Sequence, residues 1–250
     1  MGKSTTHRSY PVTPKEFEQV IVDTTVQEKT IAHPVDSRLL EIARGKVVQA
    51  ARRVGIALKQ TVAKEGKVLC RKADDYAHAR QFRRLRRAVK RQRTILGIVL
   101  REIRRKLTTA TIECAASLDR LNTLLERAER IHKQQPKDKN KLYALHAPEV
   151  ECIGKGKARK PYEFGVKASI TVTHKQGLIV GAKTFPGNPY DGHILHEQLE
   201  QTNILLEGSS AKPKQVIVDP GFSGANVDNP NVEIIHKTPA QLPYVSQINN

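Results

Sequence analysis

Hydrophobic and polar positions alternate with a period of two in several stretches, and this pattern predicts the strands of an α/β protein. Residues 18–26 form a β-branched run near the amino terminus, interrupted by one acid. Residues 162–173 and 178–185 alternate as two strands joined by His-Lys-Gln-Gly, which is typical of a β-hairpin. A final run, Val-Ile-Val at 216–218, leads directly into an acid and a Pro-Gly turn. Each run has the residue types that favour a pleated, half-buried strand.

A second period, in which apolar residues recur every three or four positions, predicts helices in the middle of the chain. Three amphipathic helices are expected, over about 40–61, 73–107 and 115–134. Asp36 or Ser37 can cap the first of them. Because this block follows the first strand and precedes the hairpin, it reads as an all-helical insertion into a different fold.

The same helical period returns between the hairpin and the last strand, over about 191–206, with Asp191 as the expected cap. The order is therefore strand, helical block, antiparallel hairpin, helix, strand. A helix between strands of one sheet usually makes a right-handed crossover, and strands distant in sequence can become parallel neighbours.

Two acids stand at the ends of β-branched runs, Asp23 after Val-Ile-Val at 20–22 and Asp219 after Val-Ile-Val at 216–218. If the two strands lie side by side, their aspartates converge at one edge of the sheet, where α/β proteins place their chemistry. Two close carboxylates repel unless a divalent cation lies between them, and oxygen ligands favour Mg²⁺ or Mn²⁺. A two-metal site of this kind can cleave phosphodiesters. The competing interpretation of Asp23 is a solvent-facing residue of an edge strand.

Positive charge concentrates in the helical block. The chain has 43 lysines and arginines against 25 acids, a formal charge of +18 that indicates a polyanionic partner. Twelve basic residues lie between positions 80 and 106, where the local sequence has one acid, Glu102. Aromatic residues are nearly absent there, which favours binding to a duplex backbone over base stacking. The alternatives are a solvated face of a helical hairpin and a merely basic protein.

The expected DNA contacts come from this helix and from a basic, glycine-rich loop at 154–161. They are Arg80, Arg83, Arg84, Arg86, Arg87, Lys90, Arg91, Arg93, Lys155, Lys157, Arg159 and Lys160.

Several other classes of protein are disfavoured. The three cysteines are far apart and form no C-x-x-C pair, which argues against a zinc site or a disulfide framework. Apolar runs stay below 18 residues and the amino terminus has no hydrophobic leader, so a membrane or secreted protein is not expected. Gly2-Lys3-Ser4-Thr5 lacks the upstream glycine of a P-loop, and Gly221–Ala225 is not G-x-S-x-G. A cytoplasmic protein is the expectation.

Several longer segments resemble a bacterial insertion-sequence transposase of the DDE class, of the insertion-sequence-five type. They are VIVDTTVQEKTIAHPVDSRLLEIARGK, YALHAPEVECIGKGKARKPYEFGVKASI, VGAKTFPGNPYDGHILHEQLEQ, VIVDPGFSG and NPNVEIIHK, within residues 16–237. Asp219, Gly221, Phe222 and Gly224 match the family's D-x-G-[YF]-x-G turn. A preceding G-N-x-x-D element is matched by Gly187, Asn188 and Asp191.

This resemblance implies an RNase H-like fold whose Asp, Asp, Glu triad binds two Mg²⁺ ions (or Mn²⁺). Asp23 and Asp219 would be the first two acids, catalytic and metal-binding. The implied activity is metal-dependent cleavage at the ends of the element and strand transfer into target DNA. Its partners would be double-stranded DNA at transposon ends and target, and another copy of the chain or a full-length transposase. The family resemblance also implies a bacterial, nucleoid-associated protein. The expected organisation is a flexible lead-in at 1–15, an incomplete RNase H-like domain at 16–35 and 141–237, the basic helical insertion at 36–140 and a divergent tail at 238–250.

The third acid of the family pattern, in a helix with an E-P-x-I-G-x-x-K-like signature, has no counterpart in this sequence. The family's N-terminal domain is not matched either. The sequence therefore predicts a chain truncated at both ends that is inactive by itself. The alternative function is a non-catalytic, DNA-binding remnant, able to interfere with full-length transposase.

Overall fold

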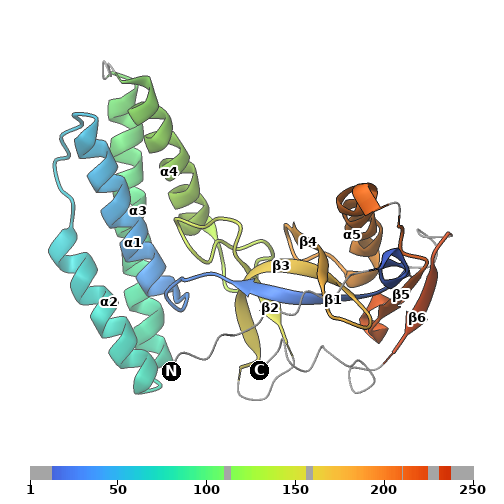
Figure 1. The fold of residues 1–250 in the computed structure, drawn as a ribbon. Helices are drawn as coiled ribbons and strands as arrows, with labels where there is room; N and C mark the ends of the chain where they lie inside the picture. The colour runs from blue at the N-terminus through green and yellow to red at the C-terminus, as the bar shows by residue number, and fades with distance from the viewer. Residues whose placement is uncertain (1–12, 110–113, 156–159, 210, 225–230, 238–250) are drawn as a thin grey trace, which may run out of the picture. The chain divides into compact units, whose positions relative to one another are not determined.

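The computed structural model describes residues 13–109, 114–155, 160–209, 211–224 and 231–237, and these divide into two compact units (Figure 1). One unit combines the chain up to Glu28 with the chain from Gly165 onward, and the other is Lys29–Phe164. Each unit is described separately below.

Strands from both ends of the chain build the sheet of the first unit. Strand β1 (Gln19–Glu28) pairs antiparallel with β3 (Tyr162–Thr173) and parallel with β5 (Gln215–Val218). Outside these, β6 (Glu233–His236) continues parallel to β5, and β4 (Ile179–Phe185) pairs antiparallel with β3. The hairpin and the first and last predicted strands are therefore confirmed, as is the parallel pairing of β1 with β5.

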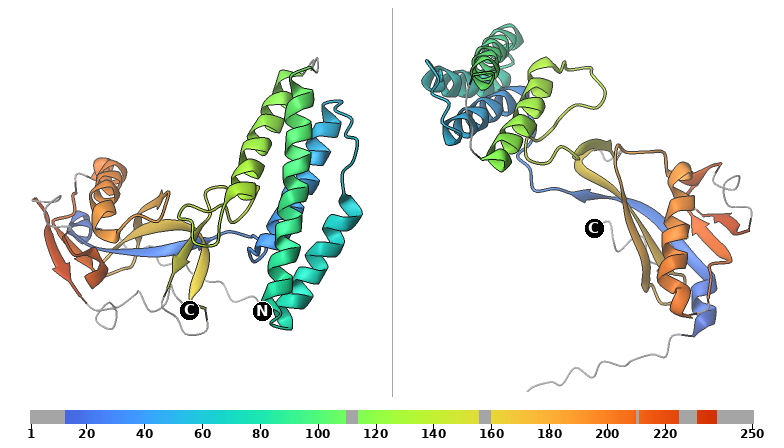
Figure 2. Two further views of the ribbon diagram at one scale, coloured as in Figure 1. Left: turned by 180° about the vertical axis from the view of Figure 1, so that it is seen from behind. Right: turned by 90° about the horizontal axis from the view of Figure 1, so that it is seen from above.

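Helix α5 (Asp191–Leu206) covers one face of this sheet (Figure 2). Leu195 and Leu199 of the helix join the even-numbered valines of β1 and β5 and Phe222 in one buried cluster. The alternate residues Ile21 and Ile217 belong to a separate buried cluster, as the period-two geometry of strands requires. The helix predicted between Asp191 and about Leu206 is confirmed, with its start one residue earlier than a cap at Asp191 would place it.

Four helices form most of the second unit: α1 (Asp36–Arg53), α2 (Ala63–His78), α3 (Phe82–Leu107) and α4 (Ala115–Lys133). Leucine, isoleucine, valine and alanine side chains from α1, α3 and α4 share the larger core of this unit. A short strand, β2 (Glu151–Gly154), follows and pairs with β3.

Two of the predicted helices have the wrong bounds. The helix expected over 40–61 ends at Arg53, because Gly55 takes a left-handed conformation at φ 80°. Val62, left-handed at φ 49°, is the N-cap of α2. The helix expected from 73 is two helices, α2 and α3, separated by Arg80 at φ 55°. The apolar period of the first helix runs on past Gly55, so periodicity alone did not indicate where that helix ends.

The predicted caps are also wrong. Val35 and Tyr190 occupy the N-cap positions of α1 and α5, and neither helix has a side-chain cap hydrogen bond. Asp36 and Asp191 are instead the first helical residues, where an acid still complements the helix dipole.

Three short 3-10 helices complete the description: η1 (Pro14–Glu18), η2 (Glu207–Ser209) and η3 (Pro220–Phe222). Within the described parts of the chain, no helix is long and apolar enough to cross a membrane.

Candidate functional site

Register places the two aspartates at the same level of the sheet, although Asp23 lies within β1, opposite Ile170 of β3, and only Asp219 follows the end of its strand. The parallel ladder between β1 and β5 pairs Gln19 with Gln215 and Ile21 with Ile217. Asp23 and Asp219 each follow two residues after the last of these pairs. Segments almost two hundred positions apart in sequence therefore bring one aspartate each to the carboxyl end of the β1–β5 ladder, the location from which α/β sheets act on ligands.

Side-chain contacts at the other end of the ladder agree with this register. The amide Nε2 of Gln19 donates to Oε1 of Gln215 at 3.0 Å, so positions 19 and 215 face the same side of the sheet. Ile21 and Ile217 share a cluster two residues later. Because alternate side chains of a strand face the same side of the sheet, positions 23 and 219 follow the same correspondence.

Backbone amides hold one oxygen of each aspartate. The N–H of Thr24 donates to Oδ1 of Asp23 at 2.8 Å, and the N–H of Gly221 donates to Oδ1 of Asp219 at 2.9 Å. The second bond makes Asp219 the N-cap of η3. Hydrogen bonds of this kind favour the ionised carboxylate.

Glycine at position 221 leaves room for two nearby carboxylates. A Cβ there would lie 2.9 Å from Oδ1 of Asp219 and 3.4 Å from Oδ2 of Asp191. The carboxylates of Asp191 and Asp219 therefore approach the same point beside the turn. Asp191 was noted in sequence only as part of G-N-x-x-D and as a cap, and its position next to Asp219 comes from the tertiary structure.

Lys167 of β3 neutralises Asp191. Its Nζ lies 2.6 Å from Oδ1 of Asp191 and also donates to the carbonyl oxygen of Pro189 at 2.6 Å. The lysine side chain is 11% exposed and the aspartate side chain 23% exposed. Lys167 was not predicted as a site residue. Its one local signal is that it is a charged residue among the small and apolar residues of a strand.

The start of α5 is fastened to the turn that carries Asp219. The hydroxyl of Tyr190 lies 2.8 Å from Oγ of Ser223, and a Cβ on Gly192 would come within 2.7 Å of the Ser223 carbonyl oxygen. Gly187 and Asn188 both take left-handed conformations, at φ 75° and 51°. Asparagine is among the few side chains that adopt this conformation readily, which explains the G-N pair of the motif.

The residues present suit a divalent cation only in part. Carboxylate oxygens are the ligands that Mg²⁺ prefers, and Asp23 and Asp219 supply them from adjacent strands. Among the residues that the structure describes, no group of three or more His, Cys, Asp or Glu side chains is arranged to hold a metal ion.

The predicted DNA-contacting residues of the helical unit lie at the start of α3. Arg80, Arg83, Arg84, Arg86, Arg87, Lys90 and Arg91 are exposed, and Arg93 is half-buried. Lys155 is half-buried and Lys160 exposed in the basic loop, while Lys157 and Arg159 lie outside the described residues.

Acids from other helices neutralise part of this charge, which the local sequence did not indicate. Glu65 of α2 accepts from Nε of Arg91 at 2.6 Å and from its Nη2 at 3.0 Å. Glu129 of α4 accepts from Nε of Arg104 at 2.7 Å. Arg93 donates to the carbonyl oxygen of Gln134. Arg91 and Arg93 are thus engaged within the helical unit.

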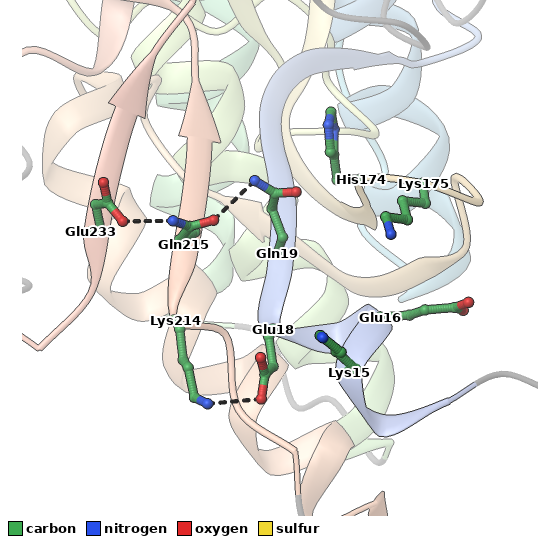
Figure 3. A pocket seen from close by; sticks show the side chains of 9 residues that line it. All are labelled: Lys15, Glu16, Glu18, Gln19, His174, Lys175, Lys214, Gln215 and Glu233. Atoms are coloured by element: carbon green, nitrogen blue, oxygen red, sulfur yellow. Dashed lines mark hydrogen bonds and ion pairs between the residues drawn. The ribbon is translucent and has the colours of Figure 1, made fainter.

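A separate cleft of about 520 Å³ lies at the amino ends of β1 and β5, away from the aspartates (Figure 3). Its lining mixes acids and bases, and Lys214 pairs with Glu18 at 2.7 Å. Gln19, Gln215 and Glu233 form a hydrogen-bonded row across β1, β5 and β6. This balance of charge does not favour a polyanion.

Comparison with known proteins finds the same family that the sequence segments around Asp191 and Asp219 resemble. Residues 116–229 match the family model of the transposase DDE domain, a span that begins in α4 and contains Asp191 and Asp219 but not Asp23. A 69-residue stretch is 49% identical to the uncharacterized protein ORF8 in the nfe locus of Rhizobium meliloti. That alignment covers 28% of this chain and 33% of the relative. No solved structure matches.

Proposed function

Because residues 116–229 of this chain belong to the transposase DDE domain family, we propose that the chain acts on DNA as part of an insertion-sequence transposase, with an RNase H-like arrangement of its sheet. The reaction would be metal-dependent cleavage at the ends of the element and strand transfer into target DNA. One observation carries the proposal: the parallel ladder that brings Asp23 and Asp219 to the same level.

In this function Asp23 and Asp219 bind Mg²⁺ or Mn²⁺. A cation held there would polarise a phosphodiester and activate the attacking oxygen. The protein's part is to orient both carboxylates through the amides of Thr24 and Gly221. The fastening of α5 to the 219–223 turn limits the movement of Asp219.

The helical unit, which we interpret as an insertion after the first strand, binds the backbone of duplex DNA. The exposed cations at the start of α3 support this role, since Arg83, Arg86 and Arg87 have no acidic partner within the described residues. Neutralising phosphates with arginine and lysine releases counterions and makes the affinity strongly dependent on salt. A footprint of about six phosphates predicts a log–log slope near −5.

We expect this chain by itself to bind DNA without cutting it, because two carboxylates hold a cation more weakly than three. The second candidate is therefore a non-catalytic DNA-binding role, in which the chain competes with full-length transposase for DNA or pairs with it. The signature of this role is salt-sensitive binding with no dependence on Asp219.

The test compares the wild-type chain with Asp219→Ala in DNA binding and DNA cleavage, with and without Mg²⁺. Equal, salt-sensitive DNA binding and no cleavage in either protein supports the non-catalytic role. Strand transfer by the wild type that Asp219→Ala abolishes supports the catalytic role and contradicts the expected inactivity. A wild-type chain that binds no duplex DNA would overturn both.

A further inference from the structure

A basic groove of about 550 Å³ lies between α1 and α2, apart from the arginines at the start of α3. Its cationic lining comes from Arg44, from Arg52 and Arg53 at the end of α1 and from Lys67 in the second turn of α2. Gln49 and Thr61 add hydrogen-bonding groups, and among the described residues no acid lines the groove. Sequence analysis assigned none of these residues to DNA.

A buried arginine and a glycine build this groove. Arg44 of α1 is 5% exposed and donates from Nη1 to the carbonyl oxygen of Thr61 at 2.9 Å, which fixes the segment before α2. Its Nε and Nη2 donate to Glu41 at 2.8 and 2.6 Å. Gly66 of α2 packs directly against Glu41, where a Cβ would collide with the carboxylate. The groove is thus held by buried contacts between the two helices.

Two acids of α1 and α2, Glu41 and Glu65, are each paired with an arginine. Arg44 binds both oxygens of Glu41, and Arg91 binds both oxygens of Glu65. The hydrogen bond from Arg91 lowers the pKa of Glu65, which keeps that pair charged.

With Arg44 paired to Glu41, the other three cations of the groove keep an excess of positive charge. Arg52, Arg53 and Lys67 are exposed, and in the described part of the chain none of them contacts a carboxylate. Three like charges around one concave surface repel one another unless an anion neutralises them.

We propose that this groove binds phosphates of the DNA backbone, as a second contact of the helical unit besides the start of α3. The inference rests on the proposed function and identifies a further part of its DNA interface. Concave shape, three free cations and neighbouring amide and hydroxyl groups match a phosphodiester, which offers only acceptors. Arg52 and Arg53 also complement the dipole at the end of α1, but Lys67 is near the beginning of α2, where the dipole disfavours a cation.

The test is a triple variant, Arg52→Gln, Arg53→Gln and Lys67→Gln, in a fluorescence-anisotropy titration with duplex DNA at several salt concentrations. We expect at least a tenfold loss of affinity at low salt. The log–log salt slope should fall by up to about 2.7, since each lost phosphate contact contributes about 0.9. A matched control, Lys46→Gln, Arg71→Gln and Lys72→Gln, removes the same charge from exposed positions of α1 and α2 outside the groove.

The control variant distinguishes the loss of a specific phosphate contact in the groove from the general effect of a lower net charge on DNA affinity. Equal losses in the two triple variants, both with native circular dichroism, would refute the groove. A larger loss and a larger change of slope in the groove variant support it. A third variant, Arg83→Gln, Arg86→Gln and Arg87→Gln, reports on α3 independently.

Two further comparisons distinguish failure of the groove inference from failure of the proposed function, and DNA phosphates from free phosphate as the ligand. Suppose that the wild type binds DNA, that the α3 variant binds it more weakly, and that the groove variant has the same DNA affinity as its control. In that case only the groove inference fails. If the wild type binds no DNA, the proposed function fails as well. Inorganic phosphate at constant ionic strength is added as the competitor, and the NMR chemical shifts of the backbone amides are followed. If these shifts change only at the groove while the groove variant binds DNA as well as its control, the groove is a site for free phosphate and the proposal is contradicted.

Discussion

The Nζ atom of Lys167 lies 2.6 Å from Oδ1 of Asp191, and this ion pair joins β3 to the first turn of α5. Both side chains are largely buried, so the pair is shielded from water and salt better than a surface pair. Asp191 in turn approaches Gly221, next to the carboxylate of Asp219. The pair therefore stabilises the surroundings of one proposed metal ligand.

Replacing Lys167 with Met should destabilise the sheet-containing unit by about 2–4 kcal/mol, because Asp191 is left as a partly buried charge without its partner. Urea unfolding measures the change. Lys183→Met is the matched control, since its pair with Glu197 has the same kind of geometry at 2.8 Å but is more exposed. A surface pair contributes at most about 1 kcal/mol. Equal effects of the two variants would contradict the role given to Lys167.

Asp23→Asn and Asp219→Asn should each lower the affinity of the protein for Mn²⁺ by about tenfold or more, because a neutral amide is a poorer ligand than a carboxylate. Isothermal titration calorimetry or electron paramagnetic resonance of Mn²⁺ measures this without any DNA. Glu200→Gln removes an exposed charge of α5 and serves as control. Unchanged Mn²⁺ affinity in both aspartate variants would rule out a site between β1 and β5.

Gly221→Ala should displace Asp219, since the new Cβ would lie 2.9 Å from its Oδ1. We expect a loss of about 1–3 kcal/mol in the free energy of unfolding and weaker Mn²⁺ binding. Gly208→Ala is the control, because no atom lies within 4 Å of a Cβ at that position and its φ is not left-handed. If Gly221→Ala binds Mn²⁺ as the wild type does, the turn is not what orients Asp219.

The stability of the helical unit should fall as the pH drops below about 6.5, through His132. Burial of its ring, and then the positive charges of Arg93 and Arg101, lower the pKa of His132. The unfolded chain therefore binds a proton at a pH where the folded chain does not, and stability rises with pH through this range. It levels off above the ordinary histidine pKa.

Thermal unfolding between pH 5 and pH 8 tests this, with His132→Gln expected to flatten the curve. Burial also lowers the pKa of His174, in the other unit, so His174→Gln is measured in parallel. An unchanged pH dependence in His132→Gln would show that other groups cause it.

Sequence patterns determined the elements whose periodicity is clear and whose ends are marked by strong signals. Alternation located the hairpin of β3 and β4, and the three-to-four period located α4 and α5 almost to the residue. The turn after Val218 was visible because an acid, proline and glycine follow a β-branched run. Local signals suffice there because the conformation depends on neighbouring residues.

Tertiary structure decided everything that depends on which surfaces meet. Periodicity indicates that one face of an element is buried but not its partner, so it could not separate α2 from α3, which one left-handed residue, Arg80, divides. The ion pair of Arg91 with Glu65 and the pair of Lys167 with Asp191 join residues 26 and 24 positions apart, which no local pattern connects. The sequence by itself marked Asp23 and Asp219 as acids that follow Val-Ile-Val runs. The parallel pairing of β1 with β5 brought them to one level, because strands so distant in sequence meet only through the packing of the whole sheet.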